Sequence, residues 1–343
     1  MLIFNDLLIK SIDHGKSELS RIDYLDGWRG IAIAFVLIAH FFRVKEIDIG
    51  RMGVDIFFVL SGMLMSKILF VKKVPLKIFY KRRISRILPV FFIYLTVISL
   101  CSLAFGLSGE HWNYIYNLFF LRAYYPENPD LWHTGLPVGH LWSLNIEEHS
   151  YIVLSIIAFF STFFKRAYFV ILVLGVGSII VRYLYIKFPE VAPPSYYLRT
   201  EVVANFIFIS AGYYLIKSNF DRFIPPWAPI LTFVLAFIFY SPYSPHWSAK
   251  WLLAPFLLAF TVNHLNLLPA VWKKMLSVSV LRVLGLWSFS IYLWQQPLYF
   301  YGTKHGYAFP YAGVTLFLAA ILMGAISFYY IENPIRKYLN DKW

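Results

Sequence analysis

The chain has 343 residues, of which 59% are hydrophobic, 20% aromatic and only 14% charged. Soluble globular domains carry roughly 25% charged residues, so the composition excludes an ordinary soluble protein, and the single cysteine, Cys101, excludes a disulfide framework or a cysteine-based metal site. The formal net charge of +13 is confined to alternate loops between apolar segments, which indicates membrane topology rather than nucleic-acid binding.

The apolar segments predict about ten transmembrane helices, because each is long enough for a hydrocarbon core about 30 Å thick. With a cytoplasmic N-terminus, 22 of the 31 Lys and Arg residues fall on the cytoplasmic side, as the positive-inside rule requires. Both termini are then cytoplasmic. The first residues lack a signal peptide, so the first span is expected to be retained. The predicted spans are 30–44, 53–71, 87–107, 146–164, 168–187, 200–217, 228–241, 249–265, 282–302 and 309–331.

We expect a single all-α integral membrane domain over residues 1–343, since the sequence has neither a repeat of fixed period nor a low-complexity linker. A cytoplasmic segment at 1–24 precedes the catalytic bundle at 25–334, and a cytoplasmic tail follows at 335–343. The predicted outer loop at 108–145 contains three histidines. Their spacing matches no metal-ligand motif, so we expect solvated side chains and no bound metal. These are His111, His133 and His140.

The first predicted span contains Asp26, Arg29 and His40. Arg29 and His40 are eleven residues apart, so they share one helix face and lie about 16 Å apart along its axis. His40 is therefore expected well inside the membrane, with Arg29 near the cytoplasmic surface. Ionisable residues inside spans usually face a protein or water-filled interior. We interpret His40 as a functional residue rather than a buried structural histidine.

The second span contains Asp55 near its outer end, followed by Ser61 and Gly62. A carboxylate at this depth needs a partner. Asp55 could orient a histidine, or it could pair with an external cation such as Arg43 or Arg51. The adjacent serine and glycine are typical of close helix packing, and we favour that interpretation for Ser61.

A run of basic residues precedes the third span on the predicted cytoplasmic side. Such a run is often a topology signal or a contact with anionic lipid. A cofactor with several phosphates would use the same donors, since arginine makes bidentate phosphate contacts. The two interpretations stay open. The run consists of Lys72, Lys73, Lys77, Lys81, Arg82, Arg83 and Arg86.

The fourth span begins with Glu147, Glu148 and His149. Acidic residues in a first helical turn are favoured by the helix dipole, but two adjacent carboxylates exceed what capping requires. They indicate a functional site near the outer membrane surface.

The segment 287–300 combines Tyr292, Gln295 and Gln296 with Pro297. Proline frees a backbone carbonyl in a helix, and polar side chains can satisfy that carbonyl. A kink there would either line a cavity or join neighbouring helices.

These five segments, in this order, resemble the acyltransferase-3 family of bacterial membrane acyltransferases over Asp23 to Pro334. The family signature in the first span, an arginine, ten residues and a histidine, matches Arg29 and His40. Further matches are Gly53 to Gly62 in the second span, Arg83 with Arg86, Trp142 to Glu147, and Glu332 to Pro334.

Two departures from the family pattern stand out. Many members have a histidine where this chain has Gln295, which argues against a mechanism with a second intramembrane histidine. Some members also append a soluble esterase-like domain. This chain shows none and resembles the membrane-only branch, which includes bacterial and phage O-antigen acetyltransferases.

The resemblance implies transfer of an acetyl group from cytoplasmic acetyl-CoA to a hydroxyl of a cell-surface or lipid-linked glycan at the bacterial inner membrane. His40 would be the general base on the hydroxyl, with an acetyl-histidine intermediate left open. Asp55 or Glu147 could fix its tautomer, and Asp26 is a further catalytic candidate. The expected ligands of CoA are Arg29, Lys81, Arg82, Arg83 and Arg86, and the expected acceptor contacts are Trp142, Glu148, Tyr292 and Gln296.

The sequence leaves some alternatives open. The acceptor could be a small molecule, the acyl group could be longer than acetyl, and the chain could form a homo-oligomer. A glycan-lipid transporter or flippase would use His40, Asp55 and Glu147 as a proton or substrate path. That class predicts inverted repeats, which the sequence does not show. Apart from the glycan, the expected partner is membrane lipid, and nucleic acid is not expected.

Overall fold

The computed structural model describes residues 22–42, 44, 46–104, 106, 112–124, 136–161, 166–307 and 311–342. Within these residues every regular element is a helix, which confirms the predicted all-α class. The expectations for His111 and His133 lie outside the described residues.

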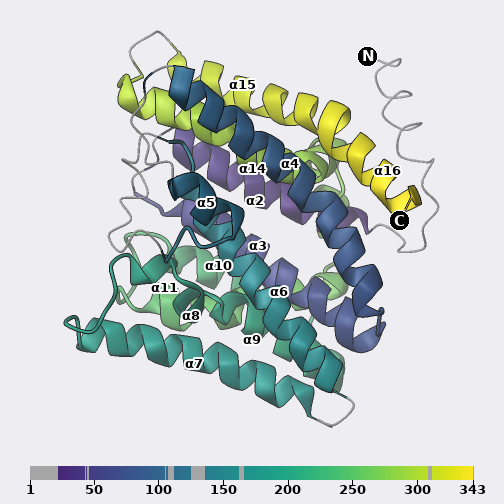
Figure 1. Cartoon of the computed structure of the whole chain (residues 1–343). Coiled ribbons are helices and arrows are strands. Elements are labelled where there is room, and N and C mark those ends of the chain that lie inside the picture. Colours follow the sequence, from purple (N-terminus) through teal and green to yellow (C-terminus); the bar gives the residue numbers. More distant parts are fainter. Residues whose placement is uncertain are drawn as a thin grey trace.

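Long helices form most of the bundle (Figure 1). They are α2 (Asp23–Phe42), α3 (Ile49–Ser66) with its π-helical extension Lys67–Val71, α4 (Leu76–Ala104), α6 (Trp142–Phe160), α7 (Ala167–Lys187), α14 (Ser279–Lys304) and α15 (Ala312–Ser327), which a π-helical turn at Phe328–Glu332 joins to α16 (Asn333–Lys342). The shorter helices are α5 (Trp112–Leu118), α8 (Thr200–Val203), α9 (Asn205–Ile216), α10 (Ala228–Phe239), α11 (Ala249–Leu252), α12 (Ala254–Asn263) and α13 (Ala270–Leu276), and the 3₁₀ turn Gly139–Leu141 precedes α6.

Five described helices are long and apolar enough to cross a membrane, and six if α13 and α14, bent by 52°, form one span. The predicted spans at 200–217, 228–241 and 249–265 contain α9, α10 and α12, which have only 12, 12 and 10 residues. At 1.5 Å per residue, each alone covers about 15–18 Å of a core about 30 Å thick. The count of about ten spans therefore remains a prediction.

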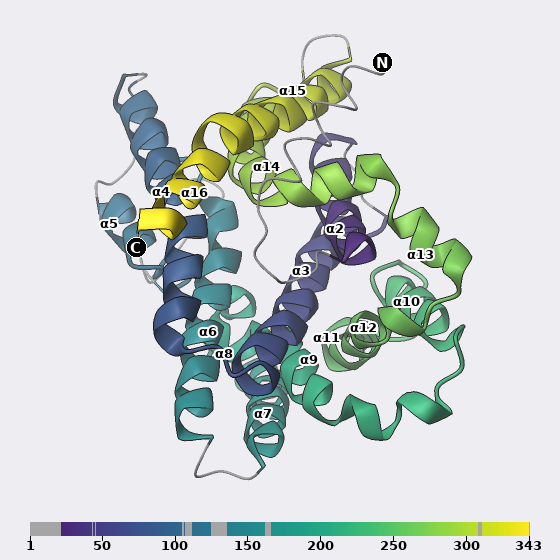
Figure 2. The ribbon, with the colours of Figure 1, turned by 90° about the vertical axis from the view of Figure 1, so that its right-hand side faces the viewer.

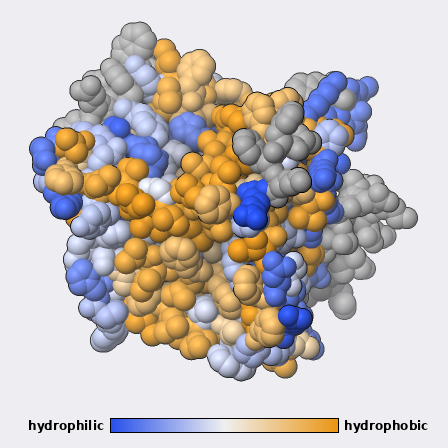
Figure 3. Space-filling model, turned by 90° about the horizontal axis from the view of Figure 1, so that it is seen from below, coloured by the Kyte–Doolittle hydropathy of each residue, from blue (hydrophilic) through white to orange (hydrophobic). Residues whose placement is uncertain are grey.

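The lateral surface of the bundle is apolar. Phe169, Val173 and Ile180 on α7 are 60%, 52% and 53% exposed, and Figure 3 shows an apolar belt between more polar margins on that side. Soluble proteins rarely expose apolar patches of this extent, so the surface is one that faces lipid. With the long apolar helices, it identifies a multi-pass membrane protein.

Helices α2 and α14 pack with their backbones in direct contact. A Cβ on Gly30 would lie 2.1 Å from the carbonyl oxygen of Leu281, and one on Gly285 would lie 1.8 Å from that of Asp26. Only glycine permits this approach, which is typical of small residues between membrane helices. The contact fixes α2 against α14, and α14 continues through Pro297 without a break.

The two ends of the bundle differ in their residues. At one end α16 lies beside α4, where Ser85 donates to Asn340 at 3.0 Å, as Figures 1 and 2 show for the two helices. The basic run of α4 and the first turn of α2 lie at this end. The opposite end has the last turn of α2, with His40, and the start of α3. Arg29 and His40 therefore point to different ends, as predicted.

Candidate functional site

Two cavities in the described part of the chain contain predicted site residues, and we call the one beside His40 the outer cavity and the one beside Arg86 the inner cavity. The outer cavity, of about 490 Å³, is lined by His40, Asp55 and Trp142 among others. The inner cavity, of about 120 Å³, is lined by Arg29, Arg83, Arg86, Ser61 and Glu147 among others. The predicted site is thus divided, with the histidine in one compartment and the arginines in another.

His40 is held by three contacts from the C-terminal half of the chain. Its Nδ1 lies 2.7 Å from Oε1 of Gln295, and its ring stacks on Tyr299 with centroids 4.2 Å apart and planes inclined by 18°. Tyr307 donates from its hydroxyl to the His40 carbonyl oxygen at 2.8 Å. Gln295 and Tyr299 lie on α14, so the α2–α14 contact positions the ring.

The surroundings of Gln295 define the tautomer of His40. The amide Nε2 of Gln295 donates to Gln296 Oε1 at 3.2 Å and to the Tyr292 carbonyl at 3.4 Å. Its Oε1 therefore faces His40 and accepts from Nδ1–H. Nε2 of His40 has no hydrogen-bond partner among the described residues and keeps its lone pair, as a general base requires.

Gln295, and neither Asp55 nor Glu147, orients His40. Asp55 is 1% exposed. It accepts from Nε of Arg51 at 3.0 and 3.1 Å and from the Tyr240 hydroxyl at 2.7 Å. The sequence left two kinds of partner open for Asp55, a histidine or an external cation, and the structure shows the cation, Arg51. Sequence reasoning noted Gln295 in the polar segment 287–300 and as a departure from the family pattern, but it missed the contact with His40.

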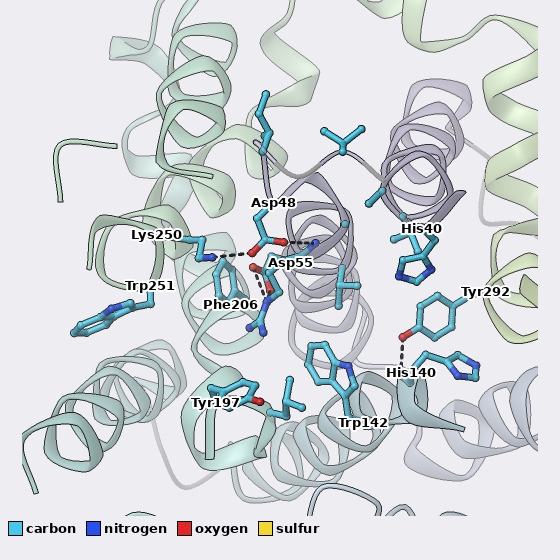
Figure 4. Close-up of a pocket in the computed structure, with 18 of the residues that line it drawn as sticks. His40, Asp48, Asp55, His140, Trp142, Tyr197, Phe206, Lys250, Trp251 and Tyr292 are labelled. Carbon is cyan, nitrogen blue, oxygen red and sulfur yellow. Dashed lines mark hydrogen bonds and ion pairs between the residues drawn. The ribbon is translucent and has the colours of Figure 1, made fainter. Parts of the chain in front are cut away.

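The outer cavity combines ion pairs with flat aromatic side chains (Figure 4). Besides Arg51 and Asp55, Lys250 pairs with Asp48 at 2.7 Å. The guanidinium of Arg51 lies 5.0 Å from the ring centroid of Trp142, which places Trp142, a predicted acceptor contact, in this cavity. Tyr197, Trp251 and Arg182 also line it, and sequence reasoning did not identify them.

His140 is not the solvated loop residue that its position predicted. It is 3% exposed and lines the outer cavity with His40. Its ring packs against Tyr94 and Tyr292, at centroid distances of 5.6 and 5.1 Å. Neither ring nitrogen has a hydrogen-bond partner among the described residues. The expectation failed because the 3₁₀ turn before α6 lies within the bundle, so His140 is a second imidazole in this cavity.

The inner cavity brings together Arg29, Arg83 and Arg86, as predicted for a phosphate site. Arg83 is paired within the protein, since it donates to one oxygen of Glu148 at 2.8 and 3.1 Å. Among the described residues Arg86 makes no ion pair within 4.0 Å, although its charge acts on the buried carboxylate of Glu332. Arg29 has a 3.4 Å contact with Asp26 and a weaker interaction with Glu147. Arg86 and Arg29 are therefore the cations more available to an anion.

The prediction of an outer site for Glu147 and Glu148 was wrong, because α6 begins at Trp142 and carries both carboxylates past its first turn to the arginines. Glu147 lies on the wall of the inner cavity. It accepts from the Ser61 hydroxyl at 2.5 Å and from the Tyr151 hydroxyl. Ser61 thus contributes to the cavity as well as to α3, while Gly62 has the predicted packing role: a Cβ there would lie 2.2 Å from the Ile207 carbonyl oxygen.

The other predicted residues lie away from the two cavities. Asp26 is buried at the start of α2, about 20 Å along the helix from His40. Gln296 is buried beside Gln295. Lys81 and Arg82, although on the same helix as Arg83, line neither cavity, and Arg82 is exposed.

Fold and site together define a multi-pass membrane protein with an intramembrane histidine at one internal cavity and arginines at another. The acyltransferase-3 profile, described as an acyltransferase domain, matches residues 22–331. The chain belongs to this acyltransferase family.

Several relatives match most of the chain. It is 29% identical to the peptidoglycan O-acetyltransferase OatA of Listeria monocytogenes over 91% of this chain and 55% of that protein. It is 25% identical to the O-acetyltransferase OatA of Staphylococcus aureus over 91% of this chain and 57% of that protein. The chain spans about half the length of the curated relatives it matches. No solved structure matches the chain.

Proposed function

We propose that the chain is an O-acyltransferase that moves an acetyl group from acetyl-CoA to a hydroxyl of a glycan. The observation that carries the proposal is the state of His40: Nδ1 is bonded to Gln295 at 2.7 Å and Nε2 remains available beside a cavity of about 490 Å³. Such a histidine can take a proton from a hydroxyl, which is a weak nucleophile while protonated.

The inner cavity would receive acetyl-CoA. Arg86 and Arg29 would contact its phosphates, because arginine binds phosphate strongly and Arg86 makes no carboxylate contact within 4.0 Å among the described residues, its charge acting on Glu332 from farther away. Arg83, paired with Glu148, would support the wall of the cavity and exchange partners only if a phosphate displaced the carboxylate. The thioester end would then point toward the outer cavity.

The outer cavity would receive the acceptor. Trp142 and Trp251 offer flat faces, and the Arg51–Asp55 and Asp48–Lys250 pairs offer hydrogen-bond donors and acceptors, a combination suited to sugar rings. A cell-surface or lipid-linked glycan fits this lining. The name of the Listeria relative adds peptidoglycan to O-antigen, capsule and exopolysaccharide as acceptor classes.

In the transfer, the acceptor oxygen attacks the thioester carbon while Nε2 of His40 takes the hydroxyl proton. The carbon–oxygen bond of the ester forms, the carbon–sulfur bond breaks, and the proton passes to the thiolate to give free CoA. Gln295 holds the ring throughout by accepting from Nδ1–H.

We further propose that the Arg86 end of the bundle faces the cytoplasm and the His40 end faces outward at a bacterial inner membrane, with about ten spans in all. The clustering of the basic run with the end of α16 supports this orientation. Reporter fusions at residue 75 and at the C-terminus should read cytoplasmic, and fusions near residue 125 should read external. An external reading at residue 75 would overturn the orientation.

The function itself is tested by mass spectrometry of surface glycans from cells that express the chain and cells that lack it. We expect a gain of one acetyl group per modified sugar in the expressing cells, and its loss in cells expressing His40→Ala at equal membrane level. If the glycans are unacetylated but differ in amount at the surface, transport would replace acyl transfer as the function.

A further inference from the structure

The outer and inner cavities meet at two side chains. Tyr292 of α14 and Val54 of α3 line both cavities, whereas His40 lines only the outer one and Arg86 only the inner one. Tyr292 and Val54 therefore form the partition between the compartment of the histidine and that of the arginines. Any acyl group passing from one to the other must pass these two residues.

Tyr292 is fixed across the partition by α6 and the turn before it. Its hydroxyl donates to the carbonyl oxygen of His140 at 2.7 Å and lies 2.5 Å from the Ser143 hydroxyl. The Ser143 hydroxyl also lies 3.2 Å from the same carbonyl oxygen, so the two hydroxyls and the carbonyl form one hydrogen-bonded group in which either hydroxyl can donate to the other. Figure 4 shows the ring of Tyr292 between those of His40 and His140.

We propose that Tyr292 determines which acyl group the enzyme transfers and keeps water of the outer cavity away from the bound thioester. The proposal rests on the proposed function, in which acetyl-CoA enters from the inner cavity. That cavity is small, about 120 Å³, and the phenol ring closes its outer end. An acetyl group extends one methyl beyond the thioester carbonyl, whereas each further methylene would press against the ring.

The same partition controls hydrolysis. Water and an acceptor hydroxyl attack a thioester carbon by the same route, and each gives its proton to a base. While the hydroxyl of Tyr292 stays bonded to His140 and Ser143, the thioester is separated from the outer cavity. Rotation of the phenol would connect the cavities for transfer to an acceptor in place.

The proposal gives different expectations for two substitutions at this position. Tyr292→Ala removes the ring and joins the cavities, so butanoyl transfer relative to acetyl transfer should rise about tenfold or more, the scale on which enzymes discriminate by one or two methylenes. Hydrolysis of acetyl-CoA without acceptor should rise as well. Tyr292→Phe keeps the ring but loses both hydrogen bonds. It should therefore keep the preference for acetyl and hydrolyse acetyl-CoA more slowly than the alanine variant.

The experiment uses the full chain, purified in lipid nanodiscs, with acetyl-, propanoyl- and butanoyl-CoA as probes. A thiol reagent measures release of CoA without acceptor, and mass spectrometry of glycans from expressing cells supplied with each acid measures transfer. Tyr301→Ala is the matched control, because Tyr301 lies on the same helix, is 49% exposed and lines neither cavity. Val54→Ala opens the partition from α3 if Tyr292→Ala fails to fold.

An unchanged acyl preference and unchanged hydrolysis in folded Tyr292→Ala or Val54→Ala protein would overturn the proposal. An altered preference in Tyr301→Ala would do so too, since the effect would then not belong to the partition. Failure of the proposed function has a different signature: the unsubstituted chain would transfer none of the three acyl groups to any glycan.

Discussion

Replacing His40 with glutamine separates its chemistry from its structural contacts. A glutamine amide at position 40 can still donate to Oε1 of Gln295, the atom that now lies 2.7 Å from Nδ1, and it can still lie flat against Tyr299. The backbone bond from Tyr307 to the carbonyl of residue 40 is unaffected. What the substitution removes is a nitrogen that can take up a proton.

The expected loss of acetyl transfer follows from the absence of that nitrogen. General base catalysis contributes about 10²–10⁴-fold, which corresponds to about 3–5 kcal/mol of transition-state stabilisation. His140 in the same cavity does not replace His40, because both of its ring nitrogens are buried and an acceptor hydroxyl in the cavity does not reach them. We therefore expect His40→Gln to transfer acetyl at no more than about a hundredth of the unsubstituted rate.

The assay is the acetyl content of surface glycans by mass spectrometry, normalised to the amount of protein in the membrane. His305→Gln is the matched control, because His305 is exposed just beyond α14 and lines neither cavity. Acetylation by well-expressed His40→Gln protein above a hundredth of the unsubstituted level would remove His40 from the role of base.

Four further substitutions test the contacts around the two cavities. Gln295→Leu should lower transfer about 10–100-fold, as for other residues that orient a functional histidine, and unchanged transfer would show that the 2.7 Å bond is dispensable. Arg86→Ala should raise the half-saturating concentration of acetyl-CoA about 10-fold or more, the scale of a charge-assisted hydrogen bond. Arg83→Ala should instead lower the thermal unfolding midpoint, because Glu148 loses its partner. Titration with acetyl-CoA measures the first effect, and a melting curve measures the second. Asp55→Asn should lower the free energy of unfolding by about 1.5–3 kcal/mol, the scale of a hydrogen bond to a charged group, because the partly buried Arg51 then has only Asp48 as a carboxylate neighbour. An unchanged unfolding midpoint in detergent would contradict that reasoning.

The helices and the assignment of His40 and Arg29 to different ends could be predicted from the sequence, because both depend on local pattern. Apolar runs define the long helices, and eleven residues of helix fix the axial separation of the two side chains. The same local reasoning did not find the breaks at Ala204, between α8 and α9, and at Leu253, between α11 and α12. Composition alone does not reveal such breaks inside an apolar run.

The partners of the site residues could not be predicted, because they come from distant parts of the chain. Gln295 lies 255 residues from His40, and Tyr292 lies 149 residues from Ser143. His140 was misjudged for the same reason, since its burial depends on a turn that the surrounding helices enclose. The spacing of residues along one helix predicts which side chains share a face. It does not predict which residues of other helices contact that face.

The glycine contact between α2 and α14 also constrains how the protein is made. The 255 residues between His40 and Gln295 take roughly 13–50 seconds to synthesise at about 5–20 residues per second. For that time α2 is in the bilayer without the helix that its glycine face fits, and the imidazole has none of its ring contacts. The catalytic centre is thus assembled late in biogenesis, and a nascent chain that stops before α14 leaves the ribosome without one.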